Sequence, residues 1–326
     1  MIIRRWLLLA AAALAVVPLA ATPAAAQNYP NRPITFIVPW AAGGGADVAS
    51  RLMGAMLERE IGQPVNVVNR AGGNGVVGHS AIANAPADGY TIGMATSEIA
   101  YLKTMGLAEI VPDSFDIIST ILVFPAGITV AAESPFKTIN DFVGALKSSP
   151  KNTFSSSGAG AGGSWHMAIA GLTKAAGLGA DRVRWVPSQG GAPALQDVMA
   201  GGITMFSGSP AESKALADAG KVRILALMSD TRSPAFPNVP TLKESGIDWS
   251  FTNWFALVAP KNLPAPVKAR LTEAAAKVHA SPDVQNPLKD RGFVPQWSGP
   301  EQGRAFANGF AVTAKTLLVD LGLAKD

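Results

Sequence analysis

Three consecutive glycines, Gly43, Gly44 and Gly45, form the part of this sequence best suited to binding an anion. Glycine has no Cβ, so the backbone N–H groups of such a loop can approach a bound group closely. The residues that follow have helical spacing, and the free N–H groups and positive dipole end of that helix would face the same point. This arrangement is typical of an anion site built from backbone. The alternative is a tight turn between a strand and a helix that binds nothing.

Two side chains beside the glycines have two interpretations each. Trp40 follows a strand-ending proline, so it either lines a cleft or fills the core, and its position favours the cleft. Asp47 either caps the helix, the interpretation we favour, or accepts a hydrogen bond from an ammonium or hydroxyl of the ligand. Glu98, which follows a later strand, is expected to be exposed.

Motifs of common catalysis are missing from the sequence. The histidines, His79, His166 and His279, are far apart without metal-ligand spacing, and the chain has no cysteine. Neither G-x-S-x-G nor G-x-x-x-x-G-K-[ST] occurs. Arg70, at the end of the second expected strand, keeps an NADP-binding enzyme as an alternative, although the loop 43–45 is not G-x-G-x-x-G. We expect no catalytic residue, no metal and no cofactor.

Residues 1–26 are predicted to be a signal peptide. A basic start at Arg4 and Arg5 is followed by an apolar run over 6–19, and three alanines at 24–26 fit a cleavage site. The run is short for a membrane span of ~20 residues, which makes a retained anchor the weaker alternative. With no cysteine in the exported chain, these features predict a protein of the bacterial periplasm, released from its signal peptide.

The net charge of +4 at pH 7 comes from basic residues that are dispersed along the chain. No run of Lys or Arg gives the electrostatic footprint of a nucleic-acid partner, so we expect none.

Strands alternate with helices in the first part of the mature chain. The expected strands and helices lie at 34–38, 46–61, 65–68, 76–85 and 90–95. Such alternation predicts a parallel sheet with right-handed crossovers. Ligands of these sheets lie beyond the carboxyl ends of the strands, which places Thr96 and Ser97 near the glycine loop.

A second unit with the same design is expected to begin near Gly127. Its run Ser157–Ser164 contains only Gly, Ser and Ala, and lies between a strand and the helix 165–176. A short connection is needed there, so the run is predicted to repeat the first loop and not to be a floppy hinge. Ser164 is expected to cap the helix, and His166 either donates to an anion or lies on the helix surface.

Two further loops and the end of the chain complete the prediction. The loop 187–191 precedes a helix at 192–199, and Ser207–Pro210 precedes another helix. A strand at 254–260 is expected to return the chain to the first domain, followed by helices at 266–279 and 300–321 with no strand between them. The predicted domains are domain I, residues 27–127 plus 254–326, and domain II, residues 128–253.

Helix N-termini from two units, lined by small polar residues, predict ligand binding without chemistry. Few fixed charges would have to be desolvated there. A carboxylate held between two such faces would keep a hinged pair of domains closed. The candidate ligand-binding residues are Trp40, Ala42, Gly43, Gly44, Asp47, Thr96, Ser97, Ser157, Gly158, Gly160, Ser164, His166, Gln189, Gly190, Ala192 and Ser209.

The sequence resembles the Bug family, the periplasmic solute-binding proteins of tripartite tricarboxylate transporters, over nearly all of the mature chain. Residues 39–47 are similar to the P-[FY]-x-[PA]-G-G-x-x-D loop of the family. The family's order and spacing also recur at Gln63-Pro64-Val65, Asn69-Arg70-Ala71-Gly72 with Gly75 and Gly78, Asp88-Gly89-Tyr90-Thr91, Gly190-Gly191-Ala192-Pro193-Ala194, Gly201-Gly202 and Val239-Pro240-Thr241-Leu242. This sequence departs from the family at Trp40, where Phe or Tyr is usual, at Ser188-Gln189, where an aromatic and Lys are frequent, and at Thr204, where Asp is usual.

The resemblance implies an α/β Venus-flytrap fold of type II-like topology, in which two domains, each a mostly parallel sheet flanked by helices, enclose the ligand. It implies that the loops 43–47, 157–164 and 187–192 hold a small carboxylate, partly through waters, with no enzyme activity. It also implies delivery to two integral membrane permease subunits, and we expect a monomer. The alternatives are an exported NADP- or phosphate-binding α/β enzyme and a sensor component that presents ligand to a receptor. Which carboxylate is bound, whether dicarboxylate, tricarboxylate, aromatic acid or amino acid, does not follow from the sequence.

Overall fold

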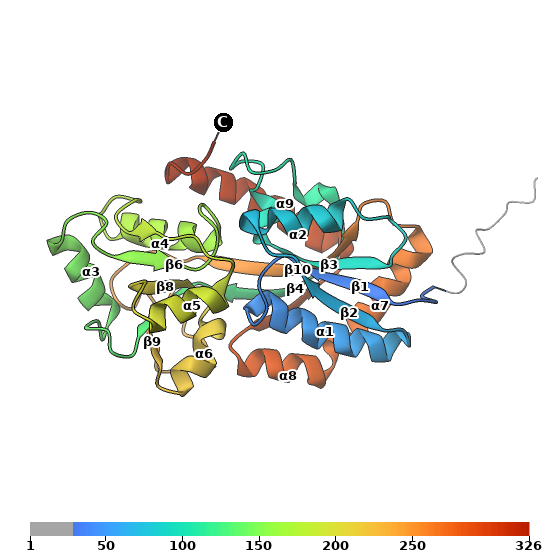
Figure 1. Cartoon of the computed structure of the whole chain (residues 1–326), viewed down its shortest axis with the longest axis horizontal. Coiled ribbons are helices and arrows are strands. Elements are labelled where there is room, and N and C mark those ends of the chain that lie inside the picture. Colours follow the sequence, from blue (N-terminus) through green and yellow to red (C-terminus); the bar gives the residue numbers. More distant parts are fainter. Residues whose placement is uncertain (1–28, 326) are drawn as a thin grey trace, which may run out of the picture.

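The computed structural model describes residues 29–325, which form two α/β lobes (Figure 1). The predicted signal peptide lies outside the described residues. The first lobe contains the strands β1 (Ile34–Val38), β2 (Val65–Asn69), β3 (Thr91–Thr96), β4 (Phe115–Pro125), β10 (Thr252–Pro260) and β11 (Val294–Ser298). Its helices are α1 (Gly45–Ile61), α2 (Val76–Ala83), α7 (Ala265–Ala280), α8 (Pro282–Asp290) and α9 (Pro300–Asp320), with short 3₁₀ turns at Gly73–Gly75, Ser97–Ala100 and Pro112–Ser114.

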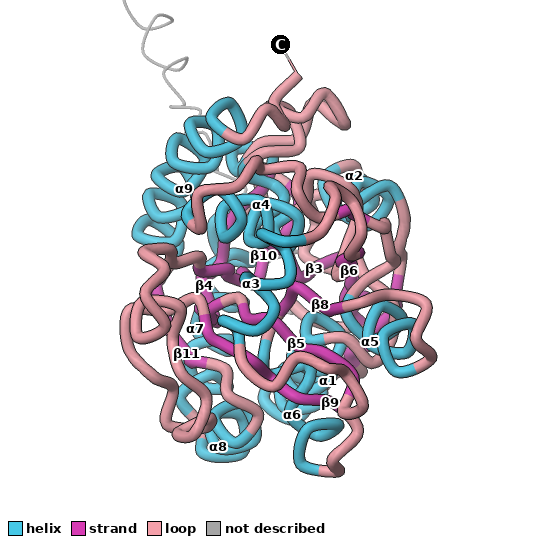
Figure 2. The backbone as a smooth tube through the Cα atoms, turned by 90° about the vertical axis from the view of Figure 1, so that its left-hand side faces the viewer, coloured by secondary structure: helices cyan, strands magenta, loops and turns pink. Residues whose placement is uncertain are grey.

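The second lobe is built from the middle of the chain. Its strands are β5 (Gly127–Ala131), β6 (Ser155–Ser157), β7 (Arg184–Trp185), β8 (Met205–Gly208) and β9 (Val222–Leu227). Its helices are α3 (Ile139–Ser148), α4 (Ser164–Ala175), α5 (Gly191–Met199) and α6 (Pro210–Asp218). Figure 2 shows the strands of the molecule in the interior and the helices around them.

Each lobe has one sheet, and the two-domain α/β fold is confirmed. The strand orders are β11-β4-β10-β3-β1-β2 and β7-β6-β8-β5-β9. The sheets are mixed, however, and not mostly parallel. Parallel pairing joins β1 to β2 and β3, and β6 to β7 and β8, whereas β4, β5, β10 and β11 pair antiparallel. The antiparallel pairs of the first sheet arise where the chain passes between the lobes. Strand β4 leads from the first lobe to the second, and β10 returns beside it in the opposite direction.

The passage strands also mark where the lobes divide. β4 ends at Pro125 in the first sheet, and β5 begins at Gly127 in the second. The chain re-enters the first sheet at Thr252. The division into residues 27–127 plus 254–326 and residues 128–253 stays a proposal, which these three positions support.

The prediction that no strand separates the final helices is wrong. β11 lies between α8 and α9 and pairs with β4, with Val294 opposite Val123. It is a partly exposed edge strand that contains Pro295, and an edge is one of the few places where a strand tolerates an interior proline. A half-exposed strand with a proline lacks the apolar alternation by which the other strands are recognised.

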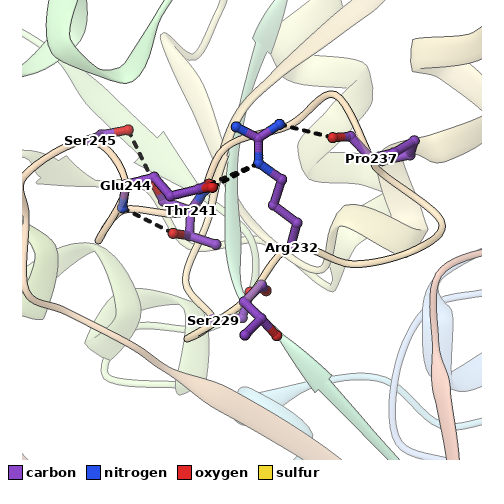
Figure 3. A network of polar contacts seen from close by, with 7 residues as sticks. Ser229, Arg232, Pro237, Thr241, Glu244 and Ser245 are labelled. Atoms are coloured by element: carbon purple, nitrogen blue, oxygen red, sulfur yellow. Dashed lines mark hydrogen bonds and ion pairs between the residues drawn. The ribbon is translucent and has the colours of Figure 1, made fainter.

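The segment between β9 and β10 is tied together by polar contacts on the surface (Figure 3). Glu244 accepts hydrogen bonds from the Arg232 Nε at 2.9 Å and from the Thr241 N–H at 2.8 Å, and its own N–H donates to the Thr241 hydroxyl. Arg232 also donates to the Pro237 carbonyl. The backbone contact with Thr241 and the Arg232 guanidinium together lower the pKa of Glu244. These contacts give the connection a defined path back to the first lobe.

Within residues 29–325, none of the helices combines the length and the apolar character that a membrane crossing requires.

Candidate functional site

A small cavity of about 30 Å³ lies where the two lobes meet. Helix α1 begins at Gly45 with Gly44 as its N-cap, and helix α5 of the other lobe begins at Gly191 with Gly190 as its N-cap. Both pairs of glycines line the cavity, so N-terminal N–H groups of two helices lie at one place. The complete lining is Trp40, Gly44, Gly45, Ala46, Thr96, Glu98, Ala159, Trp165, Gly190, Gly191, Glu212, Asn253 and Phe255.

Asp47 holds the glycine loop in shape. It is 3% exposed, and its Oδ2 accepts hydrogen bonds from the Gly43 N–H at 2.9 Å and the Arg51 Nε at 3.0 Å. Its Oδ1 accepts from the Asn69 amide at 2.9 Å. Burial opposes ionisation, but the hydrogen bonds from Arg51, Gly43 and Asn69 outweigh it and lower the pKa of Asp47. The carboxylate is therefore fully engaged by its own loop.

Trp40 forms one wall of the cavity. Its indole Nε1 donates to the Thr96 hydroxyl at 3.2 Å, and its carbonyl accepts from the Asn69 side chain at 2.9 Å. The Thr96 N–H donates in turn to the His79 Nε2 at 3.2 Å. His79 is completely buried, and burial lowers its pKa to about 3, so the ring is neutral and can accept this bond. His79 thus has a packing role that fixes the position of Thr96.

A buried hydroxyl network joins the two lobes beside the cavity. Ser97 Oγ lies 2.7 Å and the Tyr101 hydroxyl 2.6 Å from the Ser164 Oγ, while Tyr101 and Ser164 both donate to Glu98 Oε1. Two predictions are corrected here. Glu98 is 2% exposed and not at the surface, because these hydroxyls pair its carboxylate. The N-cap of α4 is Gly163, since Ser164 already has helical conformation and its hydroxyl serves the network.

His166 and the serine–glycine loop serve packing. The His166 Nδ1 accepts from the Gly162 N–H at 2.9 Å, and its ring stacks on Trp185 with centroids 4.8 Å apart. Burial lowers its pKa to about 4, so the ring carries no charge near neutral pH. A Cβ on Gly160 would lie 2.6 Å from the Asn74 side chain. These contacts pack the loop closely against its neighbours.

We predict that Gly158→Ala destabilises the second lobe. An added Cβ would lie 2.2 Å from the carbonyl oxygen of Ser207, a backbone atom that cannot turn aside. Overpacking of this kind costs about 1–3 kcal/mol. Urea unfolding of the variant should therefore give a free energy of unfolding that is lower by about this amount. A Gly144→Ala control, at a helical position with no atom within 4 Å, should change stability far less. An unchanged stability of Gly158→Ala would contradict the close packing of this loop.

The structure brings together only some of the candidate residues. Trp40, Gly44, Thr96 and Gly190 line the cavity. Across the lobes, the Ala41 N–H donates to the Gln189 carbonyl at 3.2 Å, but the Gln189 side chain is exposed. The remaining candidates do not line the cavity; they are Ala42, Gly43, Asp47, Ser97, Ser157, Gly158, Gly160, Ser164, His166, Gln189, Ala192 and Ser209.

The most consequential residue that the sequence did not indicate is Glu212, in the first turn of α6. Its Oε1 accepts a hydrogen bond from the Gly45 N–H at 2.8 Å, across the junction of the lobes. Burial raises the pKa of Glu212 to about 7, although the Gly45 N–H works in the opposite direction. An acid in the first turn of a helix is usually explained by the dipole of its own helix. Nothing in the sequence therefore indicated that Glu212 contacts the other lobe.

The cavity is lined mainly by backbone and by side chains that carry no charge. Of its lining residues only Glu98 and Glu212 have ionisable side chains, and none is Lys, Arg or His. Among the other lining residues that were not candidates, Trp165, Asn253 and Phe255 add two aromatic side chains and one amide. A site of this composition can orient a small polar molecule, but its lining includes no nucleophile paired with a base.

The chain matches known proteins along most of its length. Residues 49–323 match the family described as the tripartite tricarboxylate transporter family receptor, TctC. A relative from Pseudomonas sp., called the UPF0065 protein in the tcbD-tcbE intergenic region, is 33% identical over 283 residues, which cover 84% of this chain and 81% of the relative.

Solved structures agree with the sequence matches. The periplasmic binding protein BugD is 26% identical, with a TM-score of 0.86 over 91% of this chain and 100% of that chain. A protein from R. palustris, solved with adipate, is 26% identical, with a TM-score of 0.85 over 91% of this chain and 99% of that chain. A receptor of a transporter binds its solute without changing it, so the matches describe a binding protein and not an enzyme. The chain belongs to the TctC, or Bug, family of periplasmic solute-binding receptors of tripartite tricarboxylate transporters.

Proposed function

We propose that this protein captures a small carboxylate between its two lobes. The observation that carries the proposal is that a carboxylate group already lies in the cavity, since Glu212 accepts a hydrogen bond from the Gly45 N–H at 2.8 Å. That N–H belongs to the first turn of α1, where the helix has free donors and a positive dipole end. The first turn of α5 offers the same kind of donors to a ligand.

Support for this ligand class also comes from a relative. The R. palustris protein, whose structure was solved with adipate, has the same fold at 26% identity. Backbone N–H donors suit such an anion. They are uncharged, so the empty cavity does not have to bury an unpaired cation. Arg70, on which the NADP-binding alternative rested, is exposed and does not line the cavity.

Membership of the family supports a proposed route for the ligand. In this proposal, the protein is exported with removal of residues 1–26 and acts in the periplasm as a monomer. It delivers its carboxylate to two integral membrane subunits of a tripartite tricarboxylate-type transporter. Closure of the lobes across the cavity, through contacts such as Ser97 with Ser164, would present the loaded form to those subunits.

The proposal is tested by thermal unfolding of the mature protein with a panel of ligands. The panel contains dicarboxylates, citrate, benzoate, amino acids and NADP. A ligand at 100 times its dissociation constant adds about 2.7 kcal/mol of stability, or roughly 5 °C for a chain of this size. We expect such a rise with at least one small carboxylate. A rise with NADP alone would contradict the proposal.

Gly44→Val should weaken ligand binding and leave the fold intact. Gly44 has φ −77° and ψ 172°, a backbone conformation that valine adopts freely, and the atoms nearest to an added Cβ lie 3.4 and 3.6 Å away. The methyl groups would nevertheless occupy space at the start of α1 that the ligand needs. We expect calorimetry to show a loss of affinity of about tenfold or more, or about 1.4 kcal/mol. Unchanged affinity would remove this glycine loop from the site.

A further inference from the structure

Glu212 reaches from the second lobe to the point where two helices begin. A Cβ on Gly191, the first residue of α5, would lie 2.5 Å from the Glu212 Oε1 and 2.7 Å from its Oε2. A Cβ on Gly44, the N-cap of α1, would lie 3.4 Å from the same Oε1. The carboxyl group therefore fits between the N-termini of α1 and α5, and at Gly191 only a glycine leaves it room.

One oxygen of this carboxyl group lacks a partner. Oε1 is paired with the Gly45 N–H, whereas Oε2 is buried and has no hydrogen-bond partner among residues 29–325. A buried acceptor without a donor is costly, and native proteins leave few of them. The cavity lining contains no Lys, Arg or His that could supply the donor. A donor from the ligand would satisfy Oε2.

Asn253 supplies the complementary group. It is 2% exposed and lines the cavity, and its Oδ1 is occupied by the Trp254 N–H at 2.8 Å. The amide Nδ2 is thereby left to donate, and it meets no acceptor within the described part of the chain. The rings of Trp40, Trp165 and Phe255 form apolar walls of the same cavity. Aromatic faces attract cations such as ammonium groups.

We infer that Glu212 determines the specificity of the cavity by selecting carboxylates that also carry an N–H donor, an ammonium or a carboxamide, over dicarboxylates. The inference rests on the proposed carboxylate-binding function. The ligand carboxylate meets Asn253 and the first turn of α5, while the ligand N–H group donates to Glu212 Oε2. At pH 8, where Glu212 has lost its proton, a dicarboxylate would place its second carboxylate near Glu212 with no cation between them, and two such groups repel.

The test compares three probes that share one spacer. Adipate, its monoamide and 5-aminopentanoate carry a carboxylate at one end and a carboxylate, a carboxamide or an ammonium at the other. Succinate, its monoamide and 3-aminopropanoate form a shorter set. Calorimetry at pH 8, where Glu212 is ionised, measures the affinities of the mature wild-type protein, of Glu212→Gln and of Glu133→Gln. Glu133 is exposed in the second lobe, so this control makes the same change of charge away from the cavity.

For at least one set, we expect the wild type and Glu133→Gln to bind the monoamide or the amino acid at least tenfold tighter than the dicarboxylate. Glu212→Gln should lose this preference, and Glu212→Met supplies the same comparison if Glu212→Gln does not fold. A wild type that prefers the dicarboxylate, or a preference that survives in Glu212→Gln, would overturn the inference while the carboxylate site stands. Binding of none of the six probes by any of the proteins would contradict the proposed carboxylate site itself.

Discussion

Gly191→Val should reduce the affinity for any carboxylate by about 100-fold, or about 2.7 kcal/mol. The added Cβ would lie within 2.5–2.7 Å of three atoms of the Glu212 carboxyl group. Valine would thus push Glu212 away from the Gly45 N–H and fill the space between α1 and α5. Overpacking of this kind costs about 1–3 kcal/mol. The cost would destabilise only the closed form, in which Glu212 contacts α1. Calorimetry with the carboxylate that stabilises the wild type most is the measurement.

The matched control for this variant is Gly144→Val. Gly144 lies within helix α3, and no atom lies within 4 Å of an added Cβ. The control should bind with wild-type affinity, and circular dichroism should show that both variants are folded. If Gly191→Val bound ligand as tightly as the control, the junction of α1 and α5 would not be the binding site.

Glu212 should also make the ligand-free protein less stable as the pH rises from about 5 to about 8. Burial raises the pKa of this carboxyl group to about 7 from the ordinary value of 4.5. Between these two values the folded protein keeps a proton that the unfolded chain has released. The free energy of unfolding therefore falls as the pH rises through this window, and the loss is complete above about pH 7.

The size of the effect follows from the width of the window. At about 1.4 kcal/mol per pH unit, the loss is about 3 kcal/mol. This value is a ceiling, because opening of the lobes would rehydrate the carboxyl group without unfolding. Urea unfolding at several pH values should show the stability of Glu212→Gln rising relative to the wild type by up to this amount. Glu133→Gln should show a constant difference, and a constant difference for Glu212→Gln as well would contradict a buried, raised carboxyl group.

Local patterns predicted the elements that begin the site. A strand, a run of glycines and a helical pattern follow each other directly in the chain, and β1 and α1 lie at Ile34–Val38 and Gly45–Ile61, within one residue of the predicted bounds. The two-domain α/β fold was also predictable, from the alternation of strands and helices together with the family resemblance. These features depend on short stretches of sequence, which is the range over which hydrophobic spacing and glycine carry information.

Contacts between the two lobes could not be predicted from the sequence. Glu212 lies 167 positions along the chain from Gly45, whose N–H donates a hydrogen bond to it, and no local sequence pattern links the two residues. Glu98 was expected at the surface, but the hydroxyls of Tyr101, three residues away, and of Ser164, from the other lobe, pair its carboxylate. The mixed sheets likewise depend on where β4 and β10 pass between the lobes.

The central claim is that a ligand carboxylate lies between the lobes, where α1 and α5 begin, against N–H groups in the first turn of α5. The direct measurement is a ¹H–¹⁵N spectrum of protein labelled at glycine, titrated with the carboxylate that raises the melting temperature most. We predict the largest shift changes at Gly44, Gly45, Gly190 and Gly191, and little change at the surface glycines Gly177 and Gly246, where an added Cβ would meet no atom within 4 Å. Unchanged signals of the four cavity glycines on saturation with that ligand would contradict the claim.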